Sequence, residues 1–393
     1  MNPGAWKALL WIGLSELFAL SLWFSATVIA PELSNNWGLN SKSEAWLSVA
    51  VPIGFVFGAL ISSYFGLADR YNARKIFALS ALTGAILNGL LIFVDVALVG
   101  IILRILTGVI LAGVYPVAVK MLSQWFPTKR GLAIGILIAA LTIGSSLPHV
   151  VMIFFASVNW QLIIITSSIL ALMAAAIVNG LLTDAPGTAN QSTFSFKLLK
   201  KVTSNKPVML ANYGYFGHMW ELYAMWTWLP LFLAASFESH SPGLSSGFMR
   251  LTSFISIGIA GAIGCIVGGL LADRIGRARL TIVSMAISAA SSILIGFTFG
   301  HSVWLTFTLS IIWGIFVISD SAQFSAAVSD FADVEYLGTA LTFQMCVGFL
   351  ITIFSINLIS VLQNFVGWEW TFAALAIGPI LGIISMTKFK RYE

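Results

Sequence analysis

Charged residues are scarce in this sequence. Asp, Glu, Lys and Arg make up 9% of the 393 residues, whereas soluble domains carry roughly 25%. So few charges cannot cover a water-facing surface around a folded core. This scarcity excludes an ordinary soluble protein, and the 59% of hydrophobic residues favour a chain embedded in lipid.

Cysteines are also rare. Cys265 and Cys346 are the two in the chain, and both lie within apolar runs, which argues against a disulfide framework or a zinc site. No His-Glu-x-x-His motif occurs among the four histidines, although that motif marks many metalloproteases. We therefore predict no metal, no cofactor and no catalytic residue.

The net charge is +5, which in a soluble protein would suggest a nucleic-acid partner. The basic residues here lie mostly in short segments between apolar runs, so a role in membrane topology explains them better. We expect no nucleic-acid partner.

Long apolar runs recur along the whole chain. A run of about 18 or more residues with few charges can cross a bilayer as a helix, whereas a membrane barrel needs shorter segments of alternating polarity. We therefore predict an all-α membrane protein with twelve transmembrane helices. The predicted helices are 8–30, 45–65, 76–94, 97–120, 131–156, 160–182, 208–236, 250–272, 279–299, 303–328, 335–362 and 368–388.

The first of these runs has some features of a secretory signal peptide. Lys7 precedes it, and residues 26–30 are loosely like a cleavage site. However, the run is longer than the usual signal core of about 7–15 residues, and it carries Glu16 near its middle. We therefore interpret 8–30 as the first transmembrane helix.

A polar segment at 183–206 divides the chain into an N-terminal six-helix bundle (1–182) and a C-terminal one (207–393). Residues 194–201 within it have the pattern of a short amphipathic helix on the membrane surface. If the N-terminus is cytoplasmic, 17 of the 20 Lys and Arg residues fall in cytoplasmic segments, and the exceptions are Lys42, Arg104 and Arg250. The positive-inside rule therefore predicts both termini in the cytoplasm.

The two halves repeat a short motif in the loop after their second helix. Leu-Ala-Asp-Arg stands at 67–70 and again at 271–274, so that Asp69 and Asp273 are 204 residues apart. Parallel internal repeats of this kind are a transporter architecture.

These loops resemble the G-x-L-A-D-R-x-G-R-R/K signature of the major facilitator superfamily. The second copy matches well, whereas the first has Phe65 and Asn72 where the signature has glycine. The resemblance implies two six-helix bundles around a central cavity, with the loop charges forming a cytoplasmic gate. The implied gating residues are Asp69, Arg70, Arg74, Asp273, Arg274 and Arg277.

Shorter matches suggest a subgroup. Arg104–Gly108 resembles the fourth-helix R-x-x-x-G of the family. The segment 113–116, which contains Tyr115, and the segments 125–127, 130–133 and 184–186 resemble organic-anion and nitrate-type porters. The fifth helix lacks the G-P-x-x-G-G pattern of drug/proton antiporters. The resemblance therefore favours uptake.

Four ionisable residues lie inside predicted helices: Glu16, Arg104, Glu221 and Asp320. Such residues are costly in a bilayer and usually face a cavity or a partner. In the resembled fold, the first, fourth, seventh and tenth helices line the central cavity. Helical spacing and the resemblance add further candidates to the predicted substrate site, namely Trp23, Tyr115, His149, His218, Trp228 and Gln323.

Structural roles remain alternatives for three of these residues. Arg104 could lock helix packing by pairing with an acid. Glu16 could bond a backbone group or a hydroxyl, and His149 could make a helix–helix hydrogen bond.

Three buried acids and one buried arginine leave at least two acids without a basic partner. An unpaired ionised carboxylate is costly in a low-dielectric interior, so such an acid favours the protonated form. We predict proton-coupled uptake of a small organic solute, an organic anion or carboxylate-bearing metabolite, with Glu221, Asp320 and Glu16 as proton carriers.

The alternative is a proton-coupled exporter of drugs or organic cations, because cavity acids and aromatic rings suit cations. The absence of a His-Glu-x-x-His motif and of a Cys/His cluster disfavours a membrane enzyme. A non-transporting receptor on the same fold is a less favoured alternative. We expect a monomer that spans the lipid bilayer of the cell membrane many times, as in a bacterial inner membrane.

Overall fold

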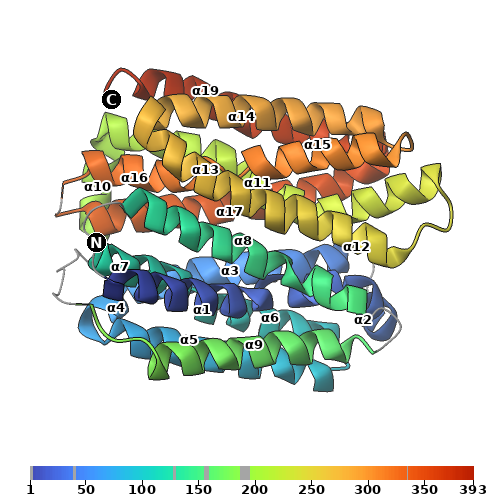
Figure 1. The fold of residues 1–393 in the computed structure, drawn as a ribbon, viewed down its shortest axis with the longest axis horizontal. Coiled ribbons are helices and arrows are strands. Elements are labelled where there is room, and N and C mark those ends of the chain that lie inside the picture. The colour runs from blue at the N-terminus through green and yellow to red at the C-terminus, as the bar shows by residue number, and fades with distance from the viewer. Residues whose placement is uncertain (1–2, 39–40, 127–129, 155–158, 186–194, 334) are drawn as a thin grey trace.

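The computed structural model describes residues 3–38, 41–126, 130–154, 159–185, 195–333 and 335–393. The described residues form helices and short turns, without strands. Figure 1 shows two bundles of nearly parallel helices, one built from each half of the chain, with both termini at the same end.

The described part of the N-terminal bundle contains nine α-helical segments and a 3-10 turn at Leu91–Phe93, because some of its membrane-spanning helices are broken. They are α1 (Pro3–Val28), α2 (Ala30–Trp37), α3 (Ser41–Tyr64), α4 (Leu67–Arg70), α5 (Ala73–Leu90), α6 (Ala97–Leu111), α7 (Tyr115–Trp125), α8 (Arg130–Phe154) and α9 (Gln161–Gly180).

The C-terminal bundle follows the short helix α10 (Leu199–Ser204) and repeats the order of the spans. Its α-helical segments are α11 (Lys206–His240), α12 (Ser246–Phe254), α13 (Ala260–Ile275), α14 (Arg277–Leu294), α15 (Val303–Phe316), α16 (Ser321–Phe331), α17 (Leu337–Val366), α18 (Trp368–Thr371) and α19 (Ile377–Phe389). The short helix predicted at 194–201 is present as a 3-10 turn at Phe196–Leu198 followed by α10.

Eleven spans among the described residues are long and apolar enough to cross a membrane, and some of them join two consecutive helical segments. The twelfth long helix is α11, whose 35 residues extend about 52 Å at 1.5 Å per residue. Its buried Asn212, His218 and Glu221 lower its hydropathy, although they do not shorten it. The predicted twelve-helix membrane fold is therefore confirmed.

The fourth helix of each half is broken, whereas the sequence pattern predicted continuous helices at 97–120 and 303–328. In the first half, α6 ends at Leu111 and α7 starts at Tyr115, with Pro116 in its first turn. Proline suits the first turn of a helix because its missing N–H needs no partner there. In the second half, α15 ends at Phe316 and α16 starts at Ser321, with Asp320 at its N-cap position.

Glycines allow the second and fourth helices of each half to touch along their backbones. A Cβ added at Gly54 of α3 would lie 1.8 Å from the backbone oxygen of Ile105 in α6. A Cβ at Gly264 of α13 would lie 2.1 Å from the backbone oxygen of Ile315 in α15. Small residues at such crossings are the usual basis of close helix packing in membranes.

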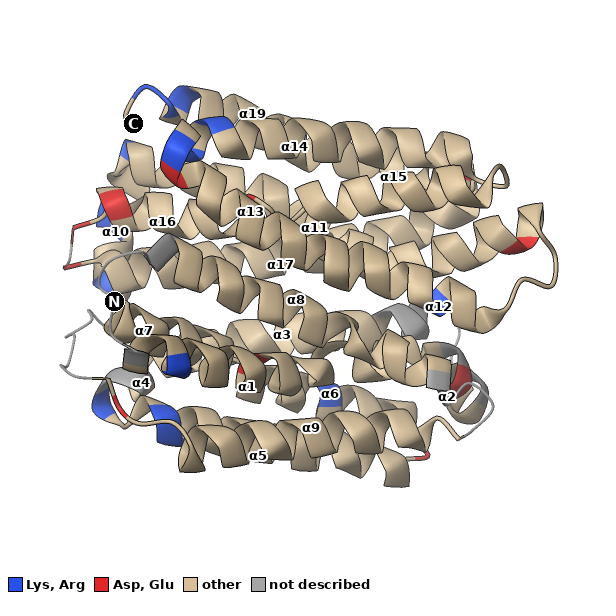
Figure 2. Cartoon of the chain, viewed as in Figure 1, with Lys and Arg blue, Asp and Glu red and all other residues tan. Residues whose placement is uncertain are grey.

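Most charges lie at the end of the molecule that carries both termini, called here the basic end (Figure 2). The basic end contains the short helix α10, the first turns of α5 and α14, and the last turn of α19 (Figure 1). The other end, called the opposite end, carries α2 and the start of α12. The assignment of the basic end to the cytoplasm remains a prediction.

Candidate functional site

Three predicted site residues meet inside the C-terminal bundle, and we call them the C-half cluster: His218, Glu221 and Asp320. His218 and Glu221 are one turn apart on α11, so they lie on neighbouring parts of one helix face. The His218 Nδ1 atom lies 3.0 Å from Asp320 Oδ1, and both side chains are 1% exposed. Asp320 reaches this position because it stands at the break between α15 and α16.

Glu221 is hydrogen-bonded to two further helices. Ser288 Oγ of α14 donates to Glu221 Oε2 at 2.7 Å, and Trp313 Nε1 of α15 donates to Glu221 Oε1 at 2.7 Å. All three residues are buried. A change in the protonation of Glu221 would therefore act directly on the packing of α11 against α14 and α15.

Gln323 lies one turn beyond Asp320 and connects to the basic end. The Arg277 Nη1 group donates to Gln323 Oε1 at 3.1 Å, while Arg277 Nε lies 2.9 Å from Asp330 Oδ2. A predicted substrate residue is thus bonded to a predicted gating residue within the same bundle.

Arg104 lies in the N-terminal bundle and is completely buried. Its Nη1 group donates to Leu22 O at 3.0 Å, to Ser25 Oγ at 3.2 Å and to Asn88 Oδ1 at 3.3 Å. Its Nη2 group donates to Trp23 O. Among the described residues Arg104 pairs with no acid, so it joins α6 to α1 and α5 through carbonyl and other neutral oxygens.

Glu16 is buried, and neither of its carboxylate oxygens has a hydrogen-bond partner among the described residues. It lies seven residues before Trp23, so the two share a face of α1. The arrangement leaves this acid without a fixed charge partner in the described part of the chain.

Two cavities lie along the interface between the halves. The larger, of about 280 Å³, lies toward the opposite end between α1, α2, α3 and α8 on one side and α11 and α12 on the other. The smaller, of about 40 Å³, is lined mainly by aromatic and aliphatic residues. Trp226 of α11 lines both cavities and so lies between them.

Four of the ten predicted substrate-site residues line these cavities. His149 and Trp228 line the large cavity, and Trp23 and Tyr115 line the small one. The remaining six are buried outside the linings of both cavities: Glu16, Arg104, His218, Glu221, Asp320 and Gln323.

Arg250, Glu32 and Trp226 also line the large cavity, although the sequence did not place them in the predicted site. In the sequence, Arg250 is only an exception to the positive-inside distribution. The signal that could have identified Arg250 is its position, because few other basic residues lie near the opposite end of the molecule. Glu32 follows the first apolar run directly. Hydropathy cannot show whether a residue at the end of a membrane helix lines a cavity.

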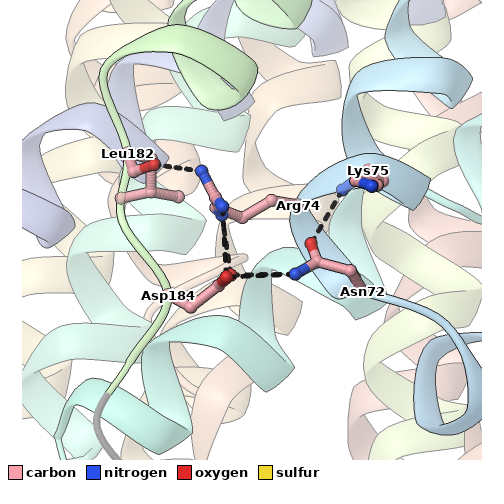
Figure 3. Close-up of polar contacts among 5 residues, drawn as sticks. All are labelled: Asn72, Arg74, Lys75, Leu182 and Asp184. Carbon is pink, nitrogen blue, oxygen red and sulfur yellow. Dashed lines mark hydrogen bonds and ion pairs between the residues drawn. The ribbon is translucent and has the colours of Figure 1, made fainter.

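The predicted gating residues lie at the basic end, and Figure 3 shows the contacts of Arg74 there. Arg74 Nε donates to Asp184 Oδ1 at 2.7 Å, Arg74 Nη2 donates to Asp184 Oδ2 at 3.1 Å, and Arg74 Nη1 donates to Leu182 O. Asn72 Nδ2 also donates to Asp184. The hydrogen bond from Arg74 holds the pKa of the Asp184 carboxyl below its ordinary value.

The start of α14 in the second half is held in a similar way. The Glu393 carboxylate accepts from the backbone N–H of Arg277 at 2.6 Å and from that of Ala278 at 3.0 Å. Carboxylates are stabilising at the positive end of a helix. In both halves an acid that follows the last helix therefore contacts the start of the third membrane span.

Three of the other predicted gating residues are exposed. Arg70, Asp273 and Arg274 are exposed at the basic end. The side chain of Asp69 lies outside the described residues, so its predicted role stays a prediction.

One sequence pattern could be mistaken for a hydrolase motif. Residues 243–247 read Gly-Leu-Ser-Ser-Gly, which matches the G-x-S-x-G lettering of a nucleophile elbow. That elbow joins a strand to a helix, whereas this segment joins α11 to α12. Ser245 Oγ accepts a hydrogen bond from the Phe248 N–H at 3.2 Å, so this serine caps α12.

Comparison with known proteins supports a transporter. The chain is 26% identical over 336 residues to a putative niacin/nicotinamide transporter of Bacillus subtilis (strain 168), covering 80% of each chain. It is 24% identical over 297 residues to the 3-(3-hydroxy-phenyl)propionate transporter of Escherichia coli (strain K12), covering 74% of this chain and 71% of the relative.

A solved structure has the same fold. It is a bacterial homologue of the human lysosomal transporter Spinster in an inward-facing, occupied conformation. It matches with a TM-score of 0.74 at 13% identity, over 100% of this chain and 98% of that one. The family model described as Major Facilitator Superfamily matches residues 12–267 and 243–392. The protein is therefore a multi-pass membrane transporter, not an enzyme, and it belongs to the major facilitator superfamily.

Proposed function

We propose that the protein takes up a small organic anion across the cell membrane and couples this uptake to protons. The observation that carries the proposal is the large cavity between the halves, which combines a basic residue with aromatic walls. Arg250 and His149 line it together with Phe24, Trp226 and Trp228. Binding sites for small organic molecules are mostly apolar and contain a few polar groups that orient the ligand.

The relatives support an organic acid as the substrate. One is named for niacin and nicotinamide and the other for 3-(3-hydroxy-phenyl)propionate. Niacin and the propionate each carry a carboxylate and an aromatic ring. An arginine side chain binds a carboxylate through two parallel hydrogen bonds, and aromatic walls provide apolar surface for a ring.

The acids outside the cavities support proton coupling. Alternating access requires the two halves to rearrange, and an ionised acid without a basic partner opposes burial during this change. Protonation removes that charge. Glu221 contacts α14 and α15 through Ser288 and Trp313, and Asp320 contacts His218 of α11. A proton bound at either acid would therefore change how α11 packs.

The second candidate is an exporter of drugs or organic cations. Glu32 favours it, because this acid lines the same cavity as Arg250 and its Oε2 atom is buried without a hydrogen-bond partner among the described residues. A cation could bind there and stack on the neighbouring rings.

Transport into proteoliposomes separates the two candidates. The purified protein would be tested with radiolabelled benzoate, niacin, an aliphatic dicarboxylate and an organic cation, with and without an imposed pH step. We expect accumulation of an aromatic acid when the lumen is alkaline relative to the outside. Accumulation of the cation driven by an acidic lumen, with no flux of the acids, would replace the proposal by the exporter.

A further inference from the structure

Arg250 has the properties of an anion anchor in the large cavity. It belongs to α12 in the C-terminal half, and its Nη1 group donates to Met152 O of α8 in the N-terminal half at 2.8 Å. A guanidinium carries five N–H donors. Among the described residues Arg250 forms no ion pair at contact distance, although the Glu32 carboxylate is near enough to interact with its charge. Its donors other than the one bonded to Met152 can therefore serve a ligand in the cavity that it lines.

Glu32 provides the opposite chemistry in the same cavity. This residue lies in the first turn of α2 and lines the cavity together with Arg250. Its Oε2 atom is buried without a hydrogen-bond partner in the described part of the chain. An unpaired buried acceptor reduces stability unless a donor reaches it, so a ligand that brings a donor would be preferred.

Aromatic side chains line the same cavity as these two groups. The rings of Phe24 and Trp226 lie with their centroids 6.2 Å apart at 66°. Trp228 is held in place because its Nε1 group donates to Ile356 O at 2.9 Å. The volume of about 280 Å³ lies just below the range of about 300–1,000 Å³ for pockets that hold drug-sized molecules. A ligand with one ring fits this space better than a larger one.

We infer that the large cavity binds an aromatic monocarboxylate with a hydrogen-bond donor on its ring, with Arg250 anchoring the carboxylate and Glu32 accepting the donor. This inference rests on the proposed function and makes its substrate class specific. A simple anion would leave Glu32 without a donor, and a simple cation would leave Arg250 without an acceptor. A ligand with both groups satisfies both residues.

The assignment is tested by calorimetric binding to the purified protein in lipid nanodiscs, without any ion gradient. The probes are 4-hydroxybenzoate, benzoate, 4-hydroxybenzyl alcohol and succinate. We expect 4-hydroxybenzoate to bind most tightly. Arg250→Gln should weaken both aromatic acids on the order of ten- to a hundredfold, as expected for a lost charged hydrogen-bonding pair, and leave the alcohol unchanged.

Further variants separate the two contacts. Glu32→Met removes the acceptor at similar volume, so it should reduce the preference for 4-hydroxybenzoate over benzoate without abolishing either. Arg250→Lys keeps the charge but loses the planar fork, and we expect a smaller loss than with Arg250→Gln. Arg279→Gln is the matched control, because Arg279 is exposed on α14 and lies outside the cavity.

Each alternative result has a definite meaning. If wild-type protein and Arg250→Gln bind the acids equally, the anchor is wrong while organic-anion transport can still hold. If succinate binds and the aromatic acids do not, the substrate class is wrong, again without affecting anion transport. If no acid binds and none is transported in the liposome assay, the proposed function fails together with the inference.

Discussion

His218 of α11 and Asp320 at the break between α15 and α16 lie in contact inside the C-terminal bundle, with Nδ1 and Oδ1 3.0 Å apart. The contact joins the long seventh span to the point where the tenth span is interrupted. Both side chains are almost completely buried, so removing either one leaves its partner without this contact in a water-poor interior. This relationship gives the first of the expected mutational effects.

The coupling between His218 and Asp320 should be measurable as non-additivity. We expect His218→Gln and Asp320→Asn each to lower the free energy of unfolding, and the double variant to lose less than the two combined. Contacting residues typically show coupling of about 0.5–3 kcal/mol. Reversible unfolding in mixed micelles would measure it. The control cycle uses His240→Gln, at the exposed end of α11, with Asp320→Asn; equal coupling in both cycles would argue against a specific contact.

Neutral variants of the C-half acids should separate proton coupling from substrate movement. Glu221→Gln and Asp320→Asn mimic the protonated acids at similar volume. We expect one of them to abolish accumulation driven by a pH step and to keep exchange of substrate across the membrane. Uptake and counterflow in liposomes would measure this, with Asp95→Asn at an exposed position as the control. Normal accumulation by both variants would show that neither acid carries the proton.

Asp184 should make a pH-dependent contribution to stability. Its pKa is lowered in the folded protein by the hydrogen bond from Arg74. The contribution is therefore fully present above the ordinary Asp pKa of about 3.9 and is lost as the pH falls through the lowered folded value. Because the Asp184 side chain is 57% exposed, we expect less than about 1 kcal/mol from this pair at neutral pH.

Thermal unfolding of Asp184→Asn from pH 7 down to pH 3 would measure this contribution. The difference from wild type should shrink toward acid and with added salt. Asp333→Asn, at another exposed position, is the control. A difference that stays constant over this range would mean that charge is not the basis of the contact.

The gating role of the repeated loop acids predicts an effect on rate rather than on binding. We expect Asp69→Asn to slow transport while leaving substrate affinity nearly intact, and Asp273→Asn to act in the same direction. The large cavity lies toward the opposite end of the molecule, so these loops should not contact the substrate there. Initial rates of uptake and calorimetric binding would be compared. A large loss of affinity with normal turnover would refute the gate.

Gly54 should tolerate no side chain. The Cβ of Gly54→Ala would lie 1.8 Å from Ile105 O, so α3 and α6 would have to separate. Overpacking usually costs about 1–3 kcal/mol, and a backbone contact leaves little room for relaxation. Thermal unfolding would show the loss, with Gly180→Ala as the control because no atom lies within 4 Å of its added Cβ. Equal stability of the two variants would contradict the close crossing.

Local sequence determined the class of the protein. The apolar runs predicted twelve membrane helices, because a helix that crosses lipid must be apolar over about 20 residues. The repeated Leu-Ala-Asp-Arg segments predicted two related halves. These features depend on neighbouring residues in the chain, so they could be recognised without the structure. The breaks within the fourth helix of each half were missed, because both pieces of each helix remain apolar.

Only the tertiary structure decided which buried polar residues meet. Helical spacing correctly placed His218 beside Glu221 on one helix, but it could not show that Asp320 contacts His218 or that Trp313 bonds Glu221. Arg104 appeared in the sequence as a candidate partner for an acid, whereas its described partners are neutral oxygens. Arg250, which the charge pattern treated as an exception, lines the large cavity. The physical reason is that sequence periodicity defines only the faces of a single helix. The rotation of each helix about its axis, and the angle at which it crosses its neighbours, are decided by contacts between helices, such as the backbone contact at Gly54.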